Sequence, residues 1–275
     1  AAVLAGRLPE GAAHQFAPLD APQAVARFLG HWRPDLAVFV ESEIWPVTLR
    51  LAAARGVPLA LVNARLSPRS LRAWGRAPRT AAALLGLFDR IWTQTEETRA
   101  ALEALGADPA RLAVGGNMKA AAPAPPDDAA ERARLAAALG GAPAWAAVST
   151  HAGEEEAVLD AHLALRKRLP GARLILCPRH PARAAEVAAL AAARGLSVAR
   201  RSAGEAPGEA PVYLADTFGE TGLWFRLAPV AFLGGSLVPV GGHNPWEPAA
   251  CGAALLTGPL RETVAADMAA LEAAG

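Results

Sequence analysis

Glycine residues crowd into two neighbouring segments near the C-terminal end of the sequence, Gly234-Gly235-Ser236 and Val240 to Pro248. Glycine lets backbone amides approach a ligand closely, and a helix that begins after such a loop directs unpaired N–H groups at an anion. Glu247, about one turn into the expected helix, could accept hydrogen bonds from ribose hydroxyls. A tight turn is the competing interpretation. The pattern predicts phosphate or nucleotide contacts at the glycines and the serine between them, namely Gly235, Ser236, Gly241 and Gly242.

This glycine pattern is not that of the common nucleotide loops. The sequence contains no Walker-type Gly-Lys-Ser/Thr segment and no G-x-G-x-x-G motif. A P-loop or an ordinary dinucleotide site is therefore not expected.

A second candidate anion site is the segment Pro178-Arg179-His180-Pro181, which follows an apolar run. The two prolines fix the backbone around an arginine and a histidine. The planar guanidinium of Arg179 suits phosphate or carboxylate, and a rigid loop presents it without a large ordering cost. The alternative is a surface turn.

A third polar corner begins at Ser149 and Thr150, and the glutamates from Glu154 to Glu156 follow it closely. Ser149 or Thr150 could cap the next helix, whose first turn suits the three acids. Capping does not account for His151-Ala152-Gly153, a small corner beside an imidazole. Such a corner would let a ligand reach backbone amides.

Acidic residues follow two other apolar runs. Glu41 and Glu43 stand two positions apart after the first run, where they could serve as acid, base or cation-stabiliser. A solvated turn or a helix start explains them equally well. The segment Asp216-Thr217-Phe218-Gly219-Glu220 also follows an apolar run and leads into a helix, and Asp216 or Thr217 could be only its cap.

The elements that must position these residues alternate between short β-rich runs and helical stretches. Buried parallel strands are expected at 36–40, 59–62, 90–93, 112–114, 145–150, 174–177, 198–200, 211–215, 230–233 and 253–256. Helices are expected at 45–55, 79–87, 96–105, 154–169, 182–194 and 245–251. Repeated strand-helix-strand units predict an α/β fold with parallel sheets covered on both faces, in which ligands bind beyond the carboxyl ends of the strands.

A proline-rich segment divides the alternation in two. Proline in AAAPAPPDD prevents regular structure and stiffens the chain, so residues 120–128 are expected to be a linker. We therefore predict two doubly wound domains, residues 1–119 and residues 129–275. The chain has 275 residues, of which 53% are hydrophobic, enough for two modest cores.

Composition excludes some classes of function. The net charge is only +1, which argues against nucleic acid as the main partner. No run of apolar residues is long enough to span a membrane. The two cysteines, Cys177 and Cys251, lack metal-ligand spacing and are expected to be small buried residues in a reducing compartment. Only Lys119 and Lys167 are lysines, which draws attention to both.

The polar segments also occur together in one known family. The sequence resembles the 3-deoxy-D-manno-octulosonic acid (Kdo) transferases of lipopolysaccharide assembly over nearly its whole length. The motifs that carry the resemblance, in family order, are Glu41 to Pro46, Gly116 to Lys119, Ser149 to Glu155, Pro178 to Pro181, Asp216 to Glu220, and Gly234 to Pro248.

The resemblance implies a glycosyltransferase of GT-B fold, with two Rossmann-like domains facing a cleft, a CMP-Kdo donor and a lipid A precursor as acceptor. Glu41 and Lys119 match positions that stabilise the transition state, and Glu43 lies on the possible acceptor side. The implied CMP contacts are Arg179, His180, Phe218, Gly219, Glu220, Asn244, Pro245, Trp246 and Glu247. Further donor or phosphate contacts are expected at Ser149, Thr150, His151, Gly235, Ser236, Gly241 and Gly242. No metal or cofactor is implied.

The resemblance also implies segments that this sequence does not show. Family members carry a membrane-anchoring segment and a general-base Glu upstream of the Glu41 motif, and neither has a counterpart between Ala1 and Val40. The family also continues past the position of Gly275. We therefore expect truncation at both ends, an incomplete N-terminal domain, and membrane association through the upstream anchor at the cytoplasmic face of the bacterial inner membrane.

Three functions remain open at this stage. The first is inverting transfer of Kdo from CMP-Kdo to the lipid A precursor. The second is another GT-B transferase or an epimerase with a different nucleotide sugar. The third is CMP binding without turnover, because the general-base Glu is missing.

Overall fold

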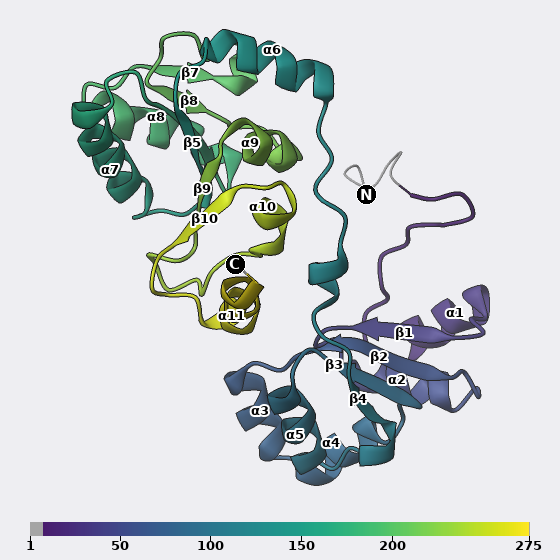
Figure 1. Ribbon diagram of the computed structural model, residues 1–275. Helices are drawn as coiled ribbons and strands as arrows, with labels where there is room; N and C mark the ends of the chain where they lie inside the picture. Colours follow the sequence, from purple (N-terminus) through teal and green to yellow (C-terminus); the bar gives the residue numbers. More distant parts are fainter. Residues whose placement is uncertain (1–7, 275) are drawn as a thin grey trace. The chain divides into compact units, whose positions relative to one another are not determined.

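The computed structural model describes residues 8–274 and divides the chain into two compact units, 1–118 and 119–275. The first boundary lies one residue before the position expected from the sequence. The proline-rich segment belongs to the second unit, and a 3₁₀ turn at Met118–Ala121 spans the unit boundary and overlaps the start of that segment. Each unit is a parallel α/β layer structure (Figure 1).

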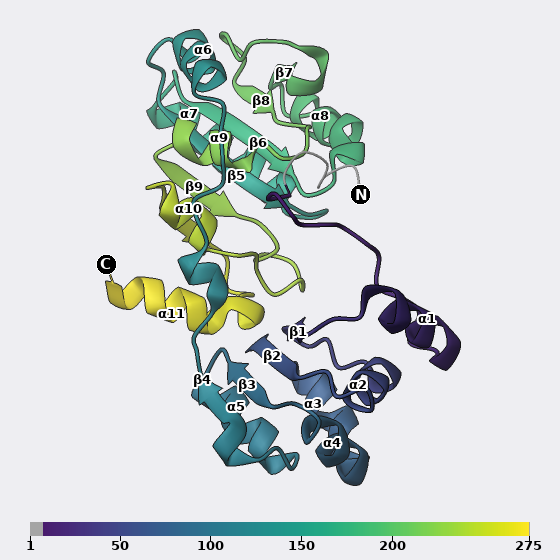
Figure 2. The same ribbon diagram turned by 90° about the vertical axis from the view of Figure 1, so that its right-hand side faces the viewer.

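The first unit contains a four-stranded parallel sheet in the order β1-β2-β3-β4 (Figure 2). The strands are β1 (Ala37–Val40), β2 (Leu59–Ala64), β3 (Arg90–Thr93) and β4 (Leu112–Val114). The helices are α1 (Pro22–Trp32), α2 (Pro46–Ala53), α3 (Pro68–Gly75), α4 (Pro78–Leu85) and α5 (Glu96–Ala104). Four of these helices carry proline in their first turn, where its missing N–H costs no hydrogen bond.

The second unit contains a six-stranded parallel sheet in the order β10-β9-β5-β6-β8-β7. The strands are β5 (Ala144–Thr150), β6 (Arg173–Pro178), β7 (Val198–Arg200), β8 (Val212–Leu214), β9 (Val230–Leu233) and β10 (Ala254–Thr257). The helices are α6 (Ala129–Leu139), α7 (Glu155–Arg168), α8 (Ala184–Ala192), α9 (Thr221–Leu227), α10 (Trp246–Ala250) and α11 (Ala265–Ala274).

Successive residues of the central strand β5 point to opposite faces of this sheet. Val148 packs into a core with Leu135 and Trp224, from α6 and α9. Ala147 packs on the other face with Leu159 and Val187, from α7 and α8. The period of two that a strand imposes on its side chains therefore produces two cores, one under each helical layer.

The strand order reverses next to β5. The chain passes from β5 to β6 on one side, and β9 returns to pair with β5 on the other. Loops that leave neighbouring strands in opposite directions open a crevice at such a point. The segments after β5, β6 and β9 meet there, and they include three of the polar motifs singled out in the sequence.

Candidate functional site

A hollow of about 330 Å³ lies at the carboxyl ends of these strands in the second unit. This volume falls within the range of about 300–1,000 Å³ typical of small-molecule sites. Six residues expected at the site line it together: Ser149, Arg179, Phe218, Gly219, Asn244 and Glu247. Its remaining lining comes from Cys177, Pro178, Pro181, Thr217, Thr221, Phe225, Leu233 and His243.

The loop after β6 presents cationic groups at this hollow. The backbone N–H of Arg179 donates to the carbonyl of Thr150 over 2.9 Å, which fastens the loop to the end of β5. The side chains of Arg179 and His180 are exposed. An exposed guanidinium on a fixed backbone can bind an incoming phosphate without first breaking a protein contact.

The end of β5 has an unusual backbone. Ser149 has φ of 60°, in the left-handed region that costs a residue with a Cβ about 1 kcal/mol or more. The pairing of β5 with β6 shifts register at this point. Ser149 lines the hollow, whereas Thr150 is fully buried. The geometry therefore brings Ser149 to the site and directs Thr150 into the fold.

The amides of the first glycine segment do not face an open anion site. The carboxylate of Glu154 is fully buried and accepts from the backbone N–H groups of Gly235 at 2.7 Å, Ser236 at 3.0 Å and Leu237 at 2.8 Å. It also accepts from the N–H of His151 at 2.9 Å. A protein carboxylate thus occupies the place in which the sequence analysis expected phosphate at Gly235 and Ser236.

The sequence contained a signal for this arrangement. A glutamate three residues after the start of a corner can reach back to the N–H of the first residue, as in a capping box. Glu154 stands in that relation to His151. From the sequence, Glu154 was expected only as an acid favoured at a helix start.

The second glycine segment is also fastened within the fold. The N–H of Gly242 donates to the carbonyl of Gly235 over 2.7 Å, and the carbonyl of Gly241 accepts from the N–H and hydroxyl of Thr263. The φ values of Gly241 and Gly242 are 96° and 92°, which only glycine adopts readily. These two glycines are therefore fixed by hydrogen bonds within the fold, and neither lines the hollow.

Helix α10 is shorter than expected, with five residues. The N–H of Trp246 donates to the side-chain oxygen of Asn244 over 3.2 Å. Asn244 and Glu247 still line the hollow. Pro245 is buried, and the indole N–H of Trp246 donates to Asp267 of α11 over 2.9 Å. Asn244 and Glu247, together with His243, are thus the polar groups that this motif offers to a ligand.

Two histidines form a pair beside the hollow. The Nε2 atoms of His151 and His243 lie 2.8 Å apart, and the two ring planes are nearly parallel, 11° apart, with a 5.1 Å centroid separation. The ring of His180 stands edge-on to His151, with centroids 6.0 Å apart. Burial lowers the pKa of His151 and of His243 below the usual value. His243 was missed in the sequence, because it sat inside a motif explained by its glycines.

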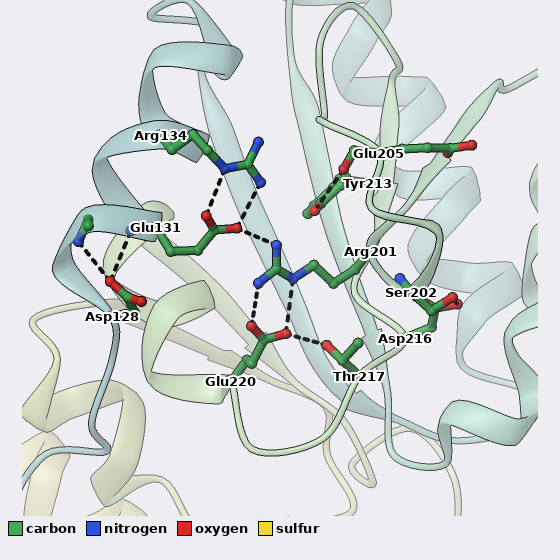
Figure 3. Close-up of polar contacts among 11 residues, drawn as sticks. Asp128, Glu131, Arg134, Arg201, Ser202, Glu205, Tyr213, Asp216, Thr217 and Glu220 are labelled. Carbon is green, nitrogen blue, oxygen red and sulfur yellow. Dashed lines mark hydrogen bonds and ion pairs between the residues drawn. The ribbon is translucent and has the colours of Figure 1, made fainter.

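Ion pairs and hydrogen bonds of its own residues fix the loop from Asp216 to Glu220 in the fold (Figure 3). Arg201 donates to Glu220 over 2.6 Å and also contacts Glu131 of α6. The hydroxyl of Thr217 donates to the same carboxylate of Glu220. Glu220 therefore anchors the loop whose Phe218 and Gly219 reach the hollow, and Glu220 itself is not among the lining residues.

The start of this loop is fastened in the same way. The buried carboxylate of Asp216 accepts from Arg200 and from the N–H and hydroxyl of Ser202. Burial alone would raise the pKa of Asp216, but the hydrogen bonds from Ser202 and the charge of Arg200 outweigh it and lower the pKa. Asp216 is thus held as an anion behind the loop and does not line the hollow.

Comparisons with known proteins bear on this arrangement. The family profile described as 3-Deoxy-D-manno-octulosonic-acid transferase (kdotransferase) matches residues 1–122. The 3-deoxy-D-manno-octulosonic acid transferase of Bordetella pertussis is 39% identical over 252 residues, which is 88% of this chain and 57% of the relative. The chain belongs to the Kdo transferase family. It spans less than two thirds of the length of this relative.

Two solved structures resemble this chain. The C-terminal CMP-Kdo binding domain of WaaA from Acinetobacter baumannii is 34% identical, with a TM-score of 0.49, over 51% of this chain and 75% of that one. The UDP-GlcNAc 2-epimerase of Methanocaldococcus jannaschii is 13% identical, with a TM-score of 0.51, over 76% of this chain and 58% of that one. The second likeness concerns the fold alone. The expected α/β architecture of GT-B type is confirmed.

The remaining predicted residues lie at the ends of the first sheet and at the sequence boundary of the two units. Glu41 follows β1 with φ of 61°, and its N–H donates to the carbonyl of Val62. Glu43 accepts a hydrogen bond from the indole of Trp45. Lys119 lies in the 3₁₀ turn before the proline-rich segment. Their roles stay predictions.

The cysteines differ in their surroundings. Cys177 is buried in the wall of the hollow, and burial raises its pKa to about 12, so it remains a thiol. Cys251 is only partly buried.

A second hollow, of about 390 Å³, is lined by apolar side chains of β5, α7, β9 and β10 and lacks polar groups that would orient a nucleotide.

Within residues 8–274, none of the helices has the length and apolar character needed to cross a bilayer. In the same residues no three potential metal ligands gather into one group. The expectations of a membrane anchor and of a metal-independent reaction stay predictions.

Proposed function

We propose that the second unit is the donor site of an inverting Kdo transferase, which transfers Kdo from CMP-Kdo to a lipid A precursor. The observation that carries the proposal is the hollow at the reversal of strand order, where three strand-end loops bring Arg179, Phe218 and Glu247 together. Membership of the family supports it. The name of the Acinetobacter domain, with 34% identity, supports CMP-Kdo as the donor.

The lining residues suit the parts of a cytidine nucleotide. Arg179 offers a guanidinium to the phosphate. Phe218 is 73% exposed at the rim, where its ring could stack on the base. Asn244 and Glu247, linked by a 3.4 Å hydrogen bond, could contact the ribose hydroxyls. Gly219, with φ of 83°, allows the turn that brings Phe218 to the rim.

The reaction follows from this placement. The acceptor oxygen forms a bond to the anomeric carbon of Kdo while the bond from that carbon to the phosphate oxygen breaks, and the electron pair leaves with CMP. Attack from the face opposite CMP inverts the anomeric carbon. Arg179 opposes the charge that develops on the phosphate. The hydroxyl proton passes to a general base, which the family places upstream of Glu41, while Glu41 and Lys119 stabilise the transition state.

The location of this enzyme is part of the proposal. A lipid A precursor is a membrane lipid, so the acceptor has to be reached at a bilayer surface. We propose the cytoplasmic face of the bacterial inner membrane, with attachment through a segment upstream of the Glu41 motif.

Titration of the 275-residue chain with CMP, UMP and GMP tests the donor assignment. We expect CMP to bind at least about tenfold more tightly than UMP or GMP, a difference of about 1.4 kcal/mol. Arg179→Ala should weaken CMP binding by about tenfold to a hundredfold, because a charged hydrogen bond is lost. Arg168→Ala, an exposed arginine at the end of α7, should leave CMP binding unchanged. Tighter binding of UMP or GMP would contradict a CMP-linked donor.

A further inference from the structure

The His151–His243 pair has no role in the reaction as described so far. His243 lines the hollow together with Arg179, and the Nε2 of His151 contacts the Nε2 of His243. The 2.8 Å contact between the two Nε2 atoms requires a single proton between them, since one ring must donate and the other accept. The pair is therefore a proton-sharing unit at the wall of the site.

The backbone holds both rings in place. A Cβ at Gly235 would lie 3.0 Å from Cδ2 and 3.1 Å from Nε2 of His243, so glycine leaves the space that the ring occupies. The N–H of His151 is fixed by its hydrogen bond to Glu154. Because Glu154 also accepts the N–H of Gly235, one carboxylate fixes the backbone of His151 and the backbone beside the ring of His243.

Charged groups of both signs surround the pair. The groups that act on His151 or His243 come from the N-cap and first turn of α7 and from the loop after β6, and they are Glu154, Glu155, Arg179 and His180. Burial disfavours the cationic form of both rings, and Arg179 disfavours it further. The free site therefore holds a neutral pair, whereas a bound phosphate would supply the negative charge that favours a cation.

We propose that the His151–His243 pair takes up one proton from solvent when the phosphodiester of the donor enters the hollow, and holds it as an imidazolium hydrogen-bonded to the neighbouring imidazole. This inference rests on the proposed function, because it needs a nucleotide phosphate beside Arg179. One added proton keeps the Nε2–Nε2 hydrogen bond, since a cationic ring donates to a neutral one. A second proton would leave two donors facing each other, so uptake stops at one.

The captured proton has a consequence for the reaction. When the bond between Kdo and the phosphate breaks, the phosphodiester becomes a monoester and gains one negative charge. An imidazolium already beside it opposes that charge without any rearrangement. The pair would thus support the departure of CMP together with Arg179.

Calorimetric titration with cytidine 5′-methyl phosphate in two buffers of different ionisation enthalpy measures the proton uptake. This phosphodiester does not titrate near neutral pH, so any proton taken up on binding must be bound by the protein. We expect uptake approaching one proton per ligand at neutral pH. As pH rises from the pKa of the free pair to the higher pKa of the bound pair, binding should weaken by up to about tenfold per pH unit, and above the higher pKa this pH dependence should disappear.

Variants identify the group that takes up the proton. His243→Gln and His151→Gln keep a polar group in the ring position, and we expect binding without uptake in both. His31→Gln, on α1 in the other unit, should retain the full uptake. The wild-type measurement stands without any variant, so a folding defect in one of them does not remove the test.

Some outcomes overturn the inference while leaving the proposed function in place. These are binding of the diester without proton uptake, uptake that survives in both pair variants, and uptake that is lost in His180→Gln but not in His243→Gln. A chain that binds no cytidine phosphodiester at any pH would contradict the proposed function itself.

Discussion

Glu154→Ala is expected to lower the free energy of unfolding of the second unit by on the order of 4 kcal/mol. The carboxylate accepts four backbone N–H groups, at distances of 2.7 to 3.0 Å, from the corner after β5 and the loop after β9. Removing it leaves these donors without their partner in a region where Gly235 and Ser236 are buried. Each unsatisfied buried donor costs about 1–3 kcal/mol, and partial entry of water lowers the sum.

Urea unfolding followed by tryptophan fluorescence measures this loss. Glu209→Ala, an exposed residue in the loop before β8, is the matched control and should leave the midpoint nearly unchanged. Glu154→Ala should also abolish CMP binding under conditions where the chain remains folded, because the loops lining the hollow lose their common anchor. A Glu154→Ala chain with the wild-type midpoint would show that the carboxylate does not hold the two loops together.

Gly234→Ala is expected to cost about 3 kcal/mol, for a reason of space alone. A Cβ at Gly234 would lie 2.4 Å from the carbonyl oxygen of Ser149 and 2.7 Å from the Cα of Thr150. Both neighbours are backbone atoms of β5, so no side chain can move aside. The end of β9 would have to separate from β5, and the floor of the hollow would open with it.

Gly171→Ala provides the comparison for this substitution. Gly171 lies in the same unit just before β6, and a Cβ there meets no atom within 4 Å. We expect the Gly171 variant to unfold at the wild-type urea concentration and to bind CMP normally. Equal urea midpoints for the two alanine variants would mean that the stability of the second unit does not depend on the close approach of β9 to β5.

Much of the fold could be predicted because its strands are short apolar runs followed at once by polar residues. The expected strands at 145–150 and 230–233 match β5 and β9 within one residue. Helices α1, α3, α6 and α11 were missed. In α6 and α11 alanine fills many positions and gives little contrast between a buried face and an exposed one, so the period of 3.6 is hard to see.

The candidate site was predictable where chemistry is local in sequence. Arg179 lies between two prolines, and Asn244 and Glu247 share one motif, so their meeting at the strand ends followed from the parallel sheet alone. The role of Glu154 depends on amides more than 80 residues away, and the partner of His151 is 92 residues away. The spacing of residues in a single sequence does not predict pairings over such distances.

The most direct test of the account is the location of bound CMP on the chain. Amide chemical shifts of the ¹⁵N-labelled 275-residue protein, recorded during a CMP titration, should change around Ser149, Arg179, Gly219 and Glu247. Shifts confined to the apolar hollow of α7, β9 and β10, or an absence of saturable shifts at millimolar CMP, would contradict a donor site at the strand ends.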